Sequence, residues 1–446
     1  MAASWPRGTE LALDFITATK WDDLPEAVRR QARRGLLDLT GALLAGRRTP
    51  VGDIMAALAV EQFPGGQATI LLSGERVSAL GAALANGFAQ NALDIDDGYR
   101  LVKGHPGACV LPALLSALEL AGGSSGRDFL TALVIGYEIG IRAGLIRHAT
   151  SSTYHSSGSW GAIAAAAAAG RLLGLSRRET GAALGAAEYH APIGPMMKGI
   201  DRPSMVKDSI GWGNLAGLGA VLLARRGFTG VEPIFSDCPE PAWLESLGRE
   251  YEILNLYFKP YAACRWAQPA VAGALNLTRT YRLDAGDIAR IRVRTFAAAA
   301  RLSRRPPADT EEAQYNLAFP VAAALLDGQV GPAQVLPPRL FDPALTALAG
   351  RVEAVVADEF EARFPAQALA EVEIETHDGR RFSSGPMEAQ WEPPAALPSD
   401  AELEDKFHLL VDPVLGQARA KDLARLIWNL DREPEALSLI QACVLA

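Results

Sequence analysis

The sequence SWGAIAAAAAAG, at positions 159–170, is the longest apolar stretch in this chain of 446 residues. A membrane-spanning helix needs about 20 predominantly apolar residues, and Arg171 ends this stretch well short of that length. Its small side chains favour a helix whose backbone lies close to neighbouring helices. The stretch therefore predicts the packed interior of a helical domain, and no membrane association is expected.

Helical spacing of apolar residues extends outward from this stretch over most of the first 260 positions. A D-x-x-E start at Asp23, with Pro25 in the first turn, leads into apolar residues at spacings of three and four that end at Gly46. Another helix begins with Ser176 and Glu179 in capping-box register. The spacing predicts helices at 23–46, 77–93, 110–120, 127–142, 159–173, 177–188 and 214–226, and a short β-type segment at 68–72.

The sequence character changes after about residue 265. Positions 291–295 (IRVRT) alternate apolar and basic residues, whereas positions 372–376 (VEIET) alternate apolar and acidic residues. Such alternation predicts half-exposed strands, and the HDG sequence at 377–379 is a hairpin signal. If the two strands are neighbours, opposite charges face each other across the sheet, namely Arg290, Arg292 and Arg294 opposite Glu371, Glu373 and Glu375. With a helix predicted at 319–327, this region is typical of an α+β domain.

The predicted fold class is mainly α, with a smaller α+β second domain. Positions 386–398 (PMEAQWEPPAALP) have the composition of a linker, and helical spacing returns at Asp400. The simplest organisation is a large helical domain built from both chain ends, residues 1–265 and 391–446. Residues 266–390 are then inserted as the smaller, lid-like α+β domain.

Composition excludes several classes of protein. With 49% hydrophobic and 21% charged residues, the chain has enough apolar material for a buried core, which argues against disorder. A net charge of -8 gives no general attraction to nucleic acid. The four cysteines form no CxxC pair, and the N-terminal MAASWPRGTELALDF lacks the basic and apolar regions of a signal peptide. We expect a cytoplasmic protein with reduced thiols.

The densest polar passage is NALDIDDGYRLVKGHPGACVLP, at positions 91–112, between two predicted helices. Loops of this kind display functional groups, although a helix end followed by a solvated turn has the same composition. Its carboxylates suit hard cations, but neither a calcium-loop motif nor a phosphate-binding motif accompanies them, so no metal is expected. The candidate residues are Asp94, Asp96, Asp97, Lys103 and His105.

Three other passages contain candidate residues. Tyr154 and His155 stand in SSTYHSSGS just before a predicted helix start, where the helix dipole favours a bound anion, although a lone loop histidine is usually only solvated. Lys207 lies in SMVKDS, and Lys259 and Arg265 lie in KPYAACR. Surface lysines are common, so neither of these last two passages identifies a site by itself.

Taken in order, these passages resemble the MmgE/PrpD family over nearly the whole chain. The family includes 2-methylcitrate dehydratases, cis-aconitate decarboxylases and an iminodisuccinate epimerase. Its fold, a large helical domain with a smaller α+β domain, usually as a homodimer, agrees with the organisation predicted above. The motifs that carry the resemblance are DIDD at 94–97, HPGACVLPALL at 105–115, GYEIGIR at 136–142, YH at 154–155 before GAIAAAAAAGRLLGL, MVK at 205–207, KPYAACR at 259–265, AQYNLAFPVAAALLDG at 313–328 and DKF at 405–407.

The resemblance implies an active site. Asp94 and His105 match the acidic and histidine positions of the family's active-site loop, His155 matches a second family histidine, and Lys207 and Lys259 match two family lysines. The family's reactions labilise a bond near a carboxylate, so that negative charge builds up on an enediolate-like group. Cationic side chains can hold such anions, and histidine can exchange a proton near neutral pH. The resemblance implies neither a metal nor a redox cofactor.

Three positions depart from the family pattern. The family often has His where this chain has Gln268, often Tyr where it has Phe319, and commonly Thr where it has Gly98. Glutamine cannot relay a proton and phenylalanine cannot donate one, so the usual dehydratase machinery would be incomplete. Tyr154, beside His155, offers a second acid/base group that would partly replace the missing ones. An epimerase would need such a pair of groups, on opposite faces of one carbon.

These inferences predict a cofactor-independent lyase that acts on a small anionic di- or tricarboxylate in a cleft between the two domains. One alternative is an epimerase or racemase of an α-substituted dicarboxylate. Another is a catalytically inactive relative that only binds a carboxylate. The predicted catalytic residues are Asp94, His105, Tyr154, His155 and Lys207, and the predicted substrate-binding residues are Lys103, Lys259, Arg265 and Gln268.

Overall fold

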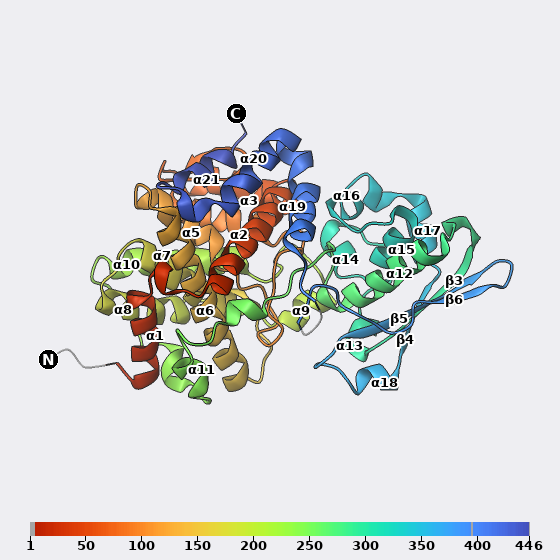
Figure 1. Cartoon of the computed structure of the whole chain (residues 1–446), viewed down its shortest axis with the longest axis horizontal. Helices are drawn as coiled ribbons and strands as arrows, with labels where there is room; N and C mark the ends of the chain where they lie inside the picture. Colours follow the sequence, from red (N-terminus) through yellow and green to blue (C-terminus); the bar gives the residue numbers. More distant parts are fainter. Residues whose placement is uncertain (1–4, 394–395, 446) are drawn as a thin grey trace.

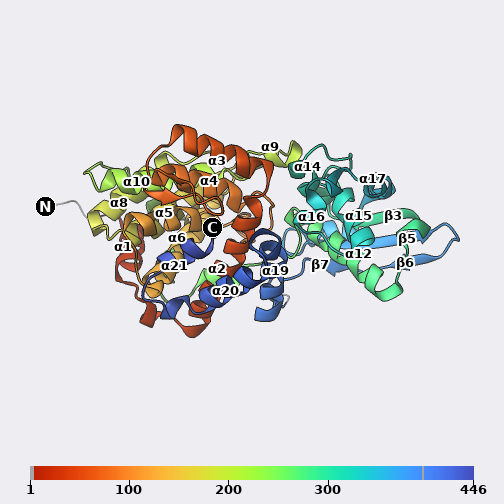
Figure 2. The same ribbon diagram turned by 90° about the horizontal axis from the view of Figure 1, so that it is seen from above.

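The chain forms a large helical lobe and a smaller lobe that contains a sheet (Figure 1). The computed structural model describes residues 5–393 and 396–445. In the larger lobe lie α1 (Arg7–Ala18), α2 (Glu26–Gly46), α3 (Pro50–Gln62), α4 (Ala79–Gln90), α5 (Leu111–Leu120), α6 (Gly126–Thr150), α7 (Gly158–Leu172), α8 (Arg177–Tyr189), α10 (Ile210–Ala224) and α11 (Ala242–Glu245), with β1 (Ala68–Thr69) and β2 (Arg76–Val77). The short helix α9 (Met196–Asp201) lies at the boundary between the lobes (Figures 1 and 2).

The C-terminal helices return to the larger lobe. They are α19 (Asp400–Leu415), α20 (Gln417–Trp428) and α21 (Leu437–Ala442). Both α19 and α20 pack against α2, so that a helix near the start of the chain and helices near its end lie side by side (Figure 1). The mainly α class, with a smaller α+β part, is therefore confirmed.

The smaller lobe contains a five-stranded sheet. Its helices are α12 (Gln268–Tyr281), α13 (Ala297–Ala300), α14 (Thr310–Gln314), α15 (Ala318–Asp327), α16 (Pro332–Val335), α17 (Pro343–Ala349) and α18 (Asp358–Glu361), and its strands are β3 (Ile288–Thr295), β4 (Val352–Val356), β5 (Leu369–Thr376), β6 (Arg381–Ser383) and β7 (Met387–Glu388). The strand order is β4-β3-β5-β6, with β7 paired to β5, and α12 packs on β5. The short strand β7 falls within the predicted linker, so that part of the linker prediction is wrong: residues 387–388 extend the sheet, and residues 394–395 lie outside the described part.

The predicted charge pairing across the sheet is confirmed. Strands β3 and β5 are antiparallel, with Arg290, Arg292 and Arg294 opposite Glu375, Glu373 and Glu371. Ion pairs join Arg292 to Glu373 at 3.4 Å and Arg294 to Glu371 at 2.6 Å. The side chain of Arg290 turns instead to Glu353 on the parallel neighbour β4.

The alanine-rich helix α7 packs closely against α6 on one side and α10 on the other, as its small residues predict. A Cβ atom added at Gly140 of α6 would lie 2.5 Å from the Cβ of Ala164, and one added at Gly217 of α10 would lie 2.4 Å from the carbonyl oxygen of Ala162. These distances are shorter than any side chain tolerates without a backbone shift. The helices can approach this closely only because glycine stands at the contacts.

Four predicted helix boundaries differ from the structure by three residues or more. Helix α10 begins at Ile210 instead of 214, and α4 ends at Gln90 instead of 93. Helix α6 continues to Thr150 instead of ending at Arg142, because that arginine is fully buried and forms an ion pair with Glu138 at 2.5 Å one turn earlier. This helix is long and apolar enough to cross a membrane, but its apolar window is buried inside the lobe, as expected for a core helix. Helix α2 begins at Glu26 because Trp21–Asp23 form a separate 3-10 turn.

A buried lysine joins both chain ends to the polar loop. Lys406 of α19 lies 2.5 Å from a carboxylate oxygen of Asp38 on α2 and donates to the carbonyl of Ile95 at 2.7 Å. Within the same loop, Asp97 accepts hydrogen bonds from the backbone N–H of Gly107 and from the hydroxyl of Tyr137. The fold thereby holds the polar loop against three helices.

We predict that Gly217→Ala destabilises the protein and that Gly219→Ala, on the same helix, does not. The new methyl at 217 would collide with backbone, which costs about 1–3 kcal/mol. At 219 the nearest atom, Leu80 Cδ2, is 3.9 Å away, so alanine adds helix propensity worth up to about 1 kcal/mol. Urea unfolding monitored by circular dichroism measures both values. Equal effects of the two substitutions would contradict the close-packing account.

We predict that Lys406→Met lowers the free energy of unfolding by about 3–5 kcal/mol, because it leaves Asp38 buried without its counter-charge. Lys421→Met, at an exposed position on α20, serves as the matched control and is expected to have little effect. The double variant Asp38→Asn/Lys406→Met should recover part of the loss in the same urea titration. No recovery would show that the cost comes from packing and not from charge.

Candidate active site

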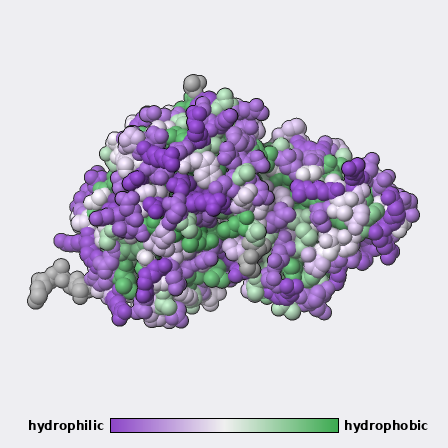
Figure 3. All heavy atoms as spheres, viewed as in Figure 1, coloured by the Kyte–Doolittle hydropathy of each residue, from purple (hydrophilic) through white to green (hydrophobic). Residues whose placement is uncertain are grey.

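A cavity of about 410 Å³ lies between the two lobes. Its walls include the polar loop and α9 from the larger lobe, and Ala298, Phe364 and Pro365 from the smaller lobe. Figure 3 shows a surface that is hydrophilic over most of the visible face, with an outline that narrows between the lobes. A cavity at the junction of two lobes is a common position for a small-molecule site, and this volume falls within the usual range of roughly 300–1,000 Å³.

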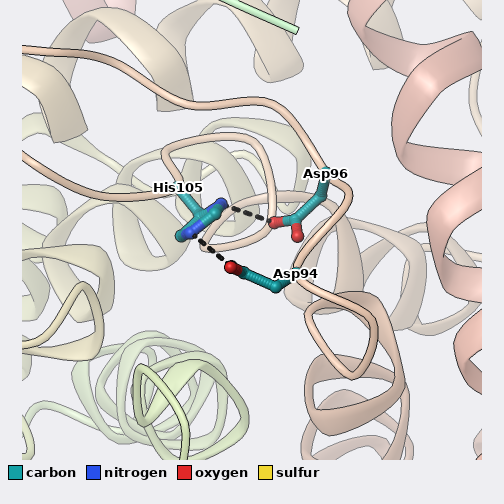
Figure 4. Close-up of side chains that lie close together, drawn as sticks. All are labelled: Asp94, Asp96 and His105. Carbon is teal, nitrogen blue, oxygen red and sulfur yellow. Dashed lines mark ion pairs between the residues drawn. The ribbon is translucent and has the colours of Figure 1, made fainter. Parts of the chain in front are cut away.

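A histidine held between two carboxylates forms the polar end of the cavity (Figure 4). His105 Nε2 lies 3.2 Å from Asp94 Oδ1, and His105 Nδ1 lies 3.1 Å from Asp96 Oδ2 and donates to the carbonyl of Asp97 at 2.8 Å. Lys259 Nζ lies 2.9 Å from the same Asp94 oxygen. The exposed fractions of His105, Asp94 and Lys259 are 6%, 2% and 2%, yet all three line the cavity.

The neighbouring charges keep this buried cluster ionised. Burial alone would lower the pKa of His105, but Asp96 and Asp94 raise it well above the ordinary value of 6.5. Burial would raise the pKa of Asp94, but Lys259, His105 and Lys207 hold it well below its usual range. At neutral pH the site therefore contains a carboxylate and an imidazolium in contact, with Lys259 Nζ against the same oxygen of Asp94.

The loops around the cavity contain strained backbone. Seven non-glycine residues in the described ranges have positive φ angles, and four belong to these loops: Asp94 at 51°, Lys103 at 50°, Lys207 at 45° and Ser209 at 57°. Such conformations cost energy in L-residues and persist where the surrounding structure imposes them, often at functional sites. Their concentration here supports the assignment of the cavity as the site.

Lys207 lies directly behind the cavity wall. Its ammonium donates to Gln314 Oε1 at 2.5 Å and lies 5.4 Å from the ring centre of Tyr315, which does line the cavity. Burial lowers the pKa of Lys207, although the nearby carboxylates of Asp94 and Glu311 act in the opposite direction. The charges of Asp94 and Lys259 act on Lys207, which therefore lies near the charged cluster.

The predicted Tyr154–His155 pair is divided. Tyr154 lines the cavity and donates to the carbonyl of Lys103 at 2.7 Å, and burial raises its pKa well above 10. His155 is not among the cavity-lining residues, and its Nε2 lies 3.1 Å from the hydroxyl of Ser151. Successive side chains of an extended backbone point in opposite directions. Tyr154 and His155 therefore do not act as one pair in this arrangement.

The predicted substrate-binding residues also differ in position. Lys103 and Arg265 line the cavity, although Arg265 is paired with Glu392, its Nε lying 2.9 Å from a carboxylate oxygen. Gln268 is buried away from the wall and donates to the carbonyls of Tyr261 and Ala263, at 3.0 and 2.7 Å. Gln268 thereby holds the loop that carries Lys259, and its geometry is that of a positioning residue.

The structure explains two of the departures from the family pattern. A Cβ atom at Gly98 would lie 2.2 Å from the ring of Tyr257, so this tyrosine occupies the space that a side chain at 98 would need. Phe319 is buried off the cavity, whereas Tyr315, four residues earlier and outside the helix that contains Phe319, lines it. Hydroxyl groups from two other tyrosines thus stand near the site.

Sequence reasoning missed several residues of the cavity. Asp208 accepts a hydrogen bond from the hydroxyl of Ser157 at 2.8 Å. It stands directly after Lys207, and Tyr315 stands inside the quoted AQYNLAF motif, so the sequence around both residues could have indicated them. The sequence around Tyr257 and the methionines of α9 gave no such indication, because apolar and aromatic residues occur in the core of any globular protein. The lining residues that were missed are Arg100, Gly104, Met196, Met197, Ile200, Asp208, Tyr257, Cys264, Trp266, Ala298, Tyr315, Phe364 and Pro365.

Asp94, Asp96 and His105 have ligand atoms within 4.8 Å of one another, which is close enough for one cation (Figure 4). However, Lys259 Nζ already lies 2.9 Å from Asp94 Oδ1, where a divalent ion would meet an ammonium. Both nitrogens of His105 are also engaged with carboxylates and carry protons in the charged form. This donor set therefore suits an imidazolium better than a metal ion.

Models of one protein family and several known proteins match this chain over most of its length. The model of the MmgE/PrpD N-terminal domain matches residues 10–242, and that of the C-terminal domain matches residues 261–432. The chain is 27% identical to the cis-aconitate decarboxylase-like protein oryM of Aspergillus oryzae, over 98% of each chain. It is 24% identical to cis-aconitate decarboxylase of Aspergillus terreus, over 94% of this chain and 92% of the relative, and 25% identical to that of Homo sapiens, over 95% and 92%. The two matches together cover most of the sequence, and the protein belongs to the MmgE/PrpD family.

Proposed function

We propose that this protein is a cofactor-independent lyase that removes carbon dioxide from a small di- or tricarboxylate of the cis-aconitate type. The observation that carries the proposal is the buried His105 at the cavity wall, held between the carboxylates of Asp94 and Asp96 and close to Lys259. An imidazolium can deliver a proton to carbon, and the ammonium can neutralise carboxylate charge. Relatives named cis-aconitate decarboxylases match over nearly the full length and support the same reaction class.

In the proposed reaction, one carbon–carboxylate bond breaks and carbon dioxide leaves. The electron pair of that bond delocalises toward a remaining carboxylate, whose growing charge Lys259 stabilises. His105 then donates its proton to the carbon skeleton and is reprotonated from solvent. Asp94 and Asp96 keep His105 charged before the transfer. No separate base is required, because the leaving carboxylate supplies the electron pair.

A second candidate is an epimerase of an α-substituted dicarboxylate. The observation in its favour is that Tyr154 and His105, two groups capable of proton transfer, both line the cavity. Deuterium entering recovered substrate without loss of carbon dioxide would favour this reaction. Binding without product or exchange would instead indicate an inactive relative. A homodimer and a cytoplasmic location stay predictions.

We predict that His105→Asn lowers kcat on cis-aconitate by about 10²–10⁴-fold, because asparagine cannot deliver the proton. The assay is NMR in heavy water, which detects decarboxylation, elimination and exchange together. His190→Asn, at an exposed position, is the matched control and should retain full activity. Dialysis against a chelator beforehand should not change the rate. Unchanged turnover in His105→Asn would exclude the proposed mechanism.

We predict that kcat falls as the pH rises through the folded-state pKa of His105. The raised pKa means that the active, protonated form predominates below it and disappears above it, so the alkaline limb should lie well above pH 6.5. Asp96→Asn removes the carboxylate that raises this pKa most, and should therefore move the limb to lower pH. Rates of both proteins are measured across pH, with circular dichroism to verify folding. A limb that does not move in Asp96→Asn would argue that another group titrates.

A further inference from the structure

The cavity has a polar end and an apolar wall that come from different elements. The polar end consists of Asp94, His105 and Lys259. The apolar wall is formed by Met197 and Ile200 of α9 and by Trp266, Phe364 and Pro365. The reaction proposed above needs the polar end only, so the apolar wall calls for a separate explanation.

Aromatic packing builds the wall on the side of the smaller lobe before any ligand binds. The ring of Phe364 stacks on Phe296 with centroids 4.2 Å apart and an interplanar angle of 9°. Trp266 meets Phe364 edge-on at 6.5 Å. Rings held in this way offer a preformed apolar surface, and little ordering cost is left for binding.

The part of the wall that α9 forms is joined to the smaller lobe by an ion pair. Asp201, the last residue of α9, forms an ion pair with Arg301, which follows α13. Met197 and Ile200 of this helix stay only half-buried, although both line the cavity. Half-buried apolar side chains on a cavity wall gain free energy when an apolar ligand group covers them.

The cations near the cavity are largely engaged already. Arg265 is paired with Glu392, Lys259 with Asp94, and Arg100 donates to the carbonyl of Ala366 at 2.8 Å. Asp208 adds a carboxylate to the lining. A ligand that placed carboxylates throughout the cavity would meet few open cations beyond Lys103, and would cover the apolar wall with charge.

We propose that the substrate is a polycarboxylate with an apolar substituent of several carbons, which lies on the wall of Met197, Ile200 and Phe364. This inference rests on the proposed function for the polar end of the molecule. The carboxylates face His105 and Lys259, and the substituent fills the remainder of the 410 Å³ cavity. Specificity then comes from chain length, because each buried methylene favours binding by a roughly constant increment.

The test compares cis-aconitate with analogues that carry methyl, propyl and hexyl substituents. We expect kcat/KM to rise about four-fold for each added methylene until the wall is covered. Binding is measured in parallel by calorimetry, so that affinity is known even for a compound that is not turned over. Equal or falling values of both kcat/KM and affinity along the series would overturn the inference and leave the proposed reaction standing.

Two single variants of the apolar wall test whether the preference for substituted analogues arises there. Met197→Gln keeps the side-chain size and Ile200→Thr keeps the branching, and each should lower the preference for the hexyl analogue over cis-aconitate by several-fold. Lys198→Gln, between them on α9 and exposed, is the control and should leave that ratio unchanged. Chain-length-dependent binding without turnover of any acid would support the apolar wall and reject the proposed reaction. Absence of binding for the whole series would reject both.

Discussion

The close approach of α6, α7 and α10 is the constraint on which the rest of the structure depends. Glycine and alanine at the contacts let three backbones lie together, and this fixes where the loops at their ends must meet. The N–H of Gly158 donates to the carbonyl of Asp208, and the hydroxyl of Ser157 accepts from the N–H of His105 while donating to Asp208. The positions of the site loops thus follow directly from the helix packing.

Buried charge is the second constraint, and it explains why the site keeps its shape without a ligand. An isolated buried ion is costly, but Asp94, His105, Lys259 and Asp96 lie close enough to offset one another. The same interactions stabilise the positive φ at Asp94, which a free loop would relax. Preorganised charge of this kind needs little rearrangement when negative charge develops on a substrate.

The two lobes supply different chemistry to one cavity. The larger lobe provides most of the charged groups, and the smaller lobe provides much of the aromatic lining. The charged groups and the aromatic wall therefore come from different parts of the chain. Gly98 and Tyr257 show how one position affects another. Because position 98 has no side chain, the ring of Tyr257 occupies the space beside it.

Periodicity and motif order determined much of this protein in advance: the mainly helical class, the strand pairing between β3 and β5, and the polar loop with Asp94 and His105. These features depend on the spacing of residues along the chain or on opposite charges that face each other in the observed register of β3 and β5. Other features were decided by tertiary structure alone. The continuation of α6 past Arg142 depends on its buried partner Glu138, and the separation of Tyr154 from His155 depends on the path of one loop. The apolar wall exists only where two lobes meet, because residues far apart in sequence acquire a common surface through folding.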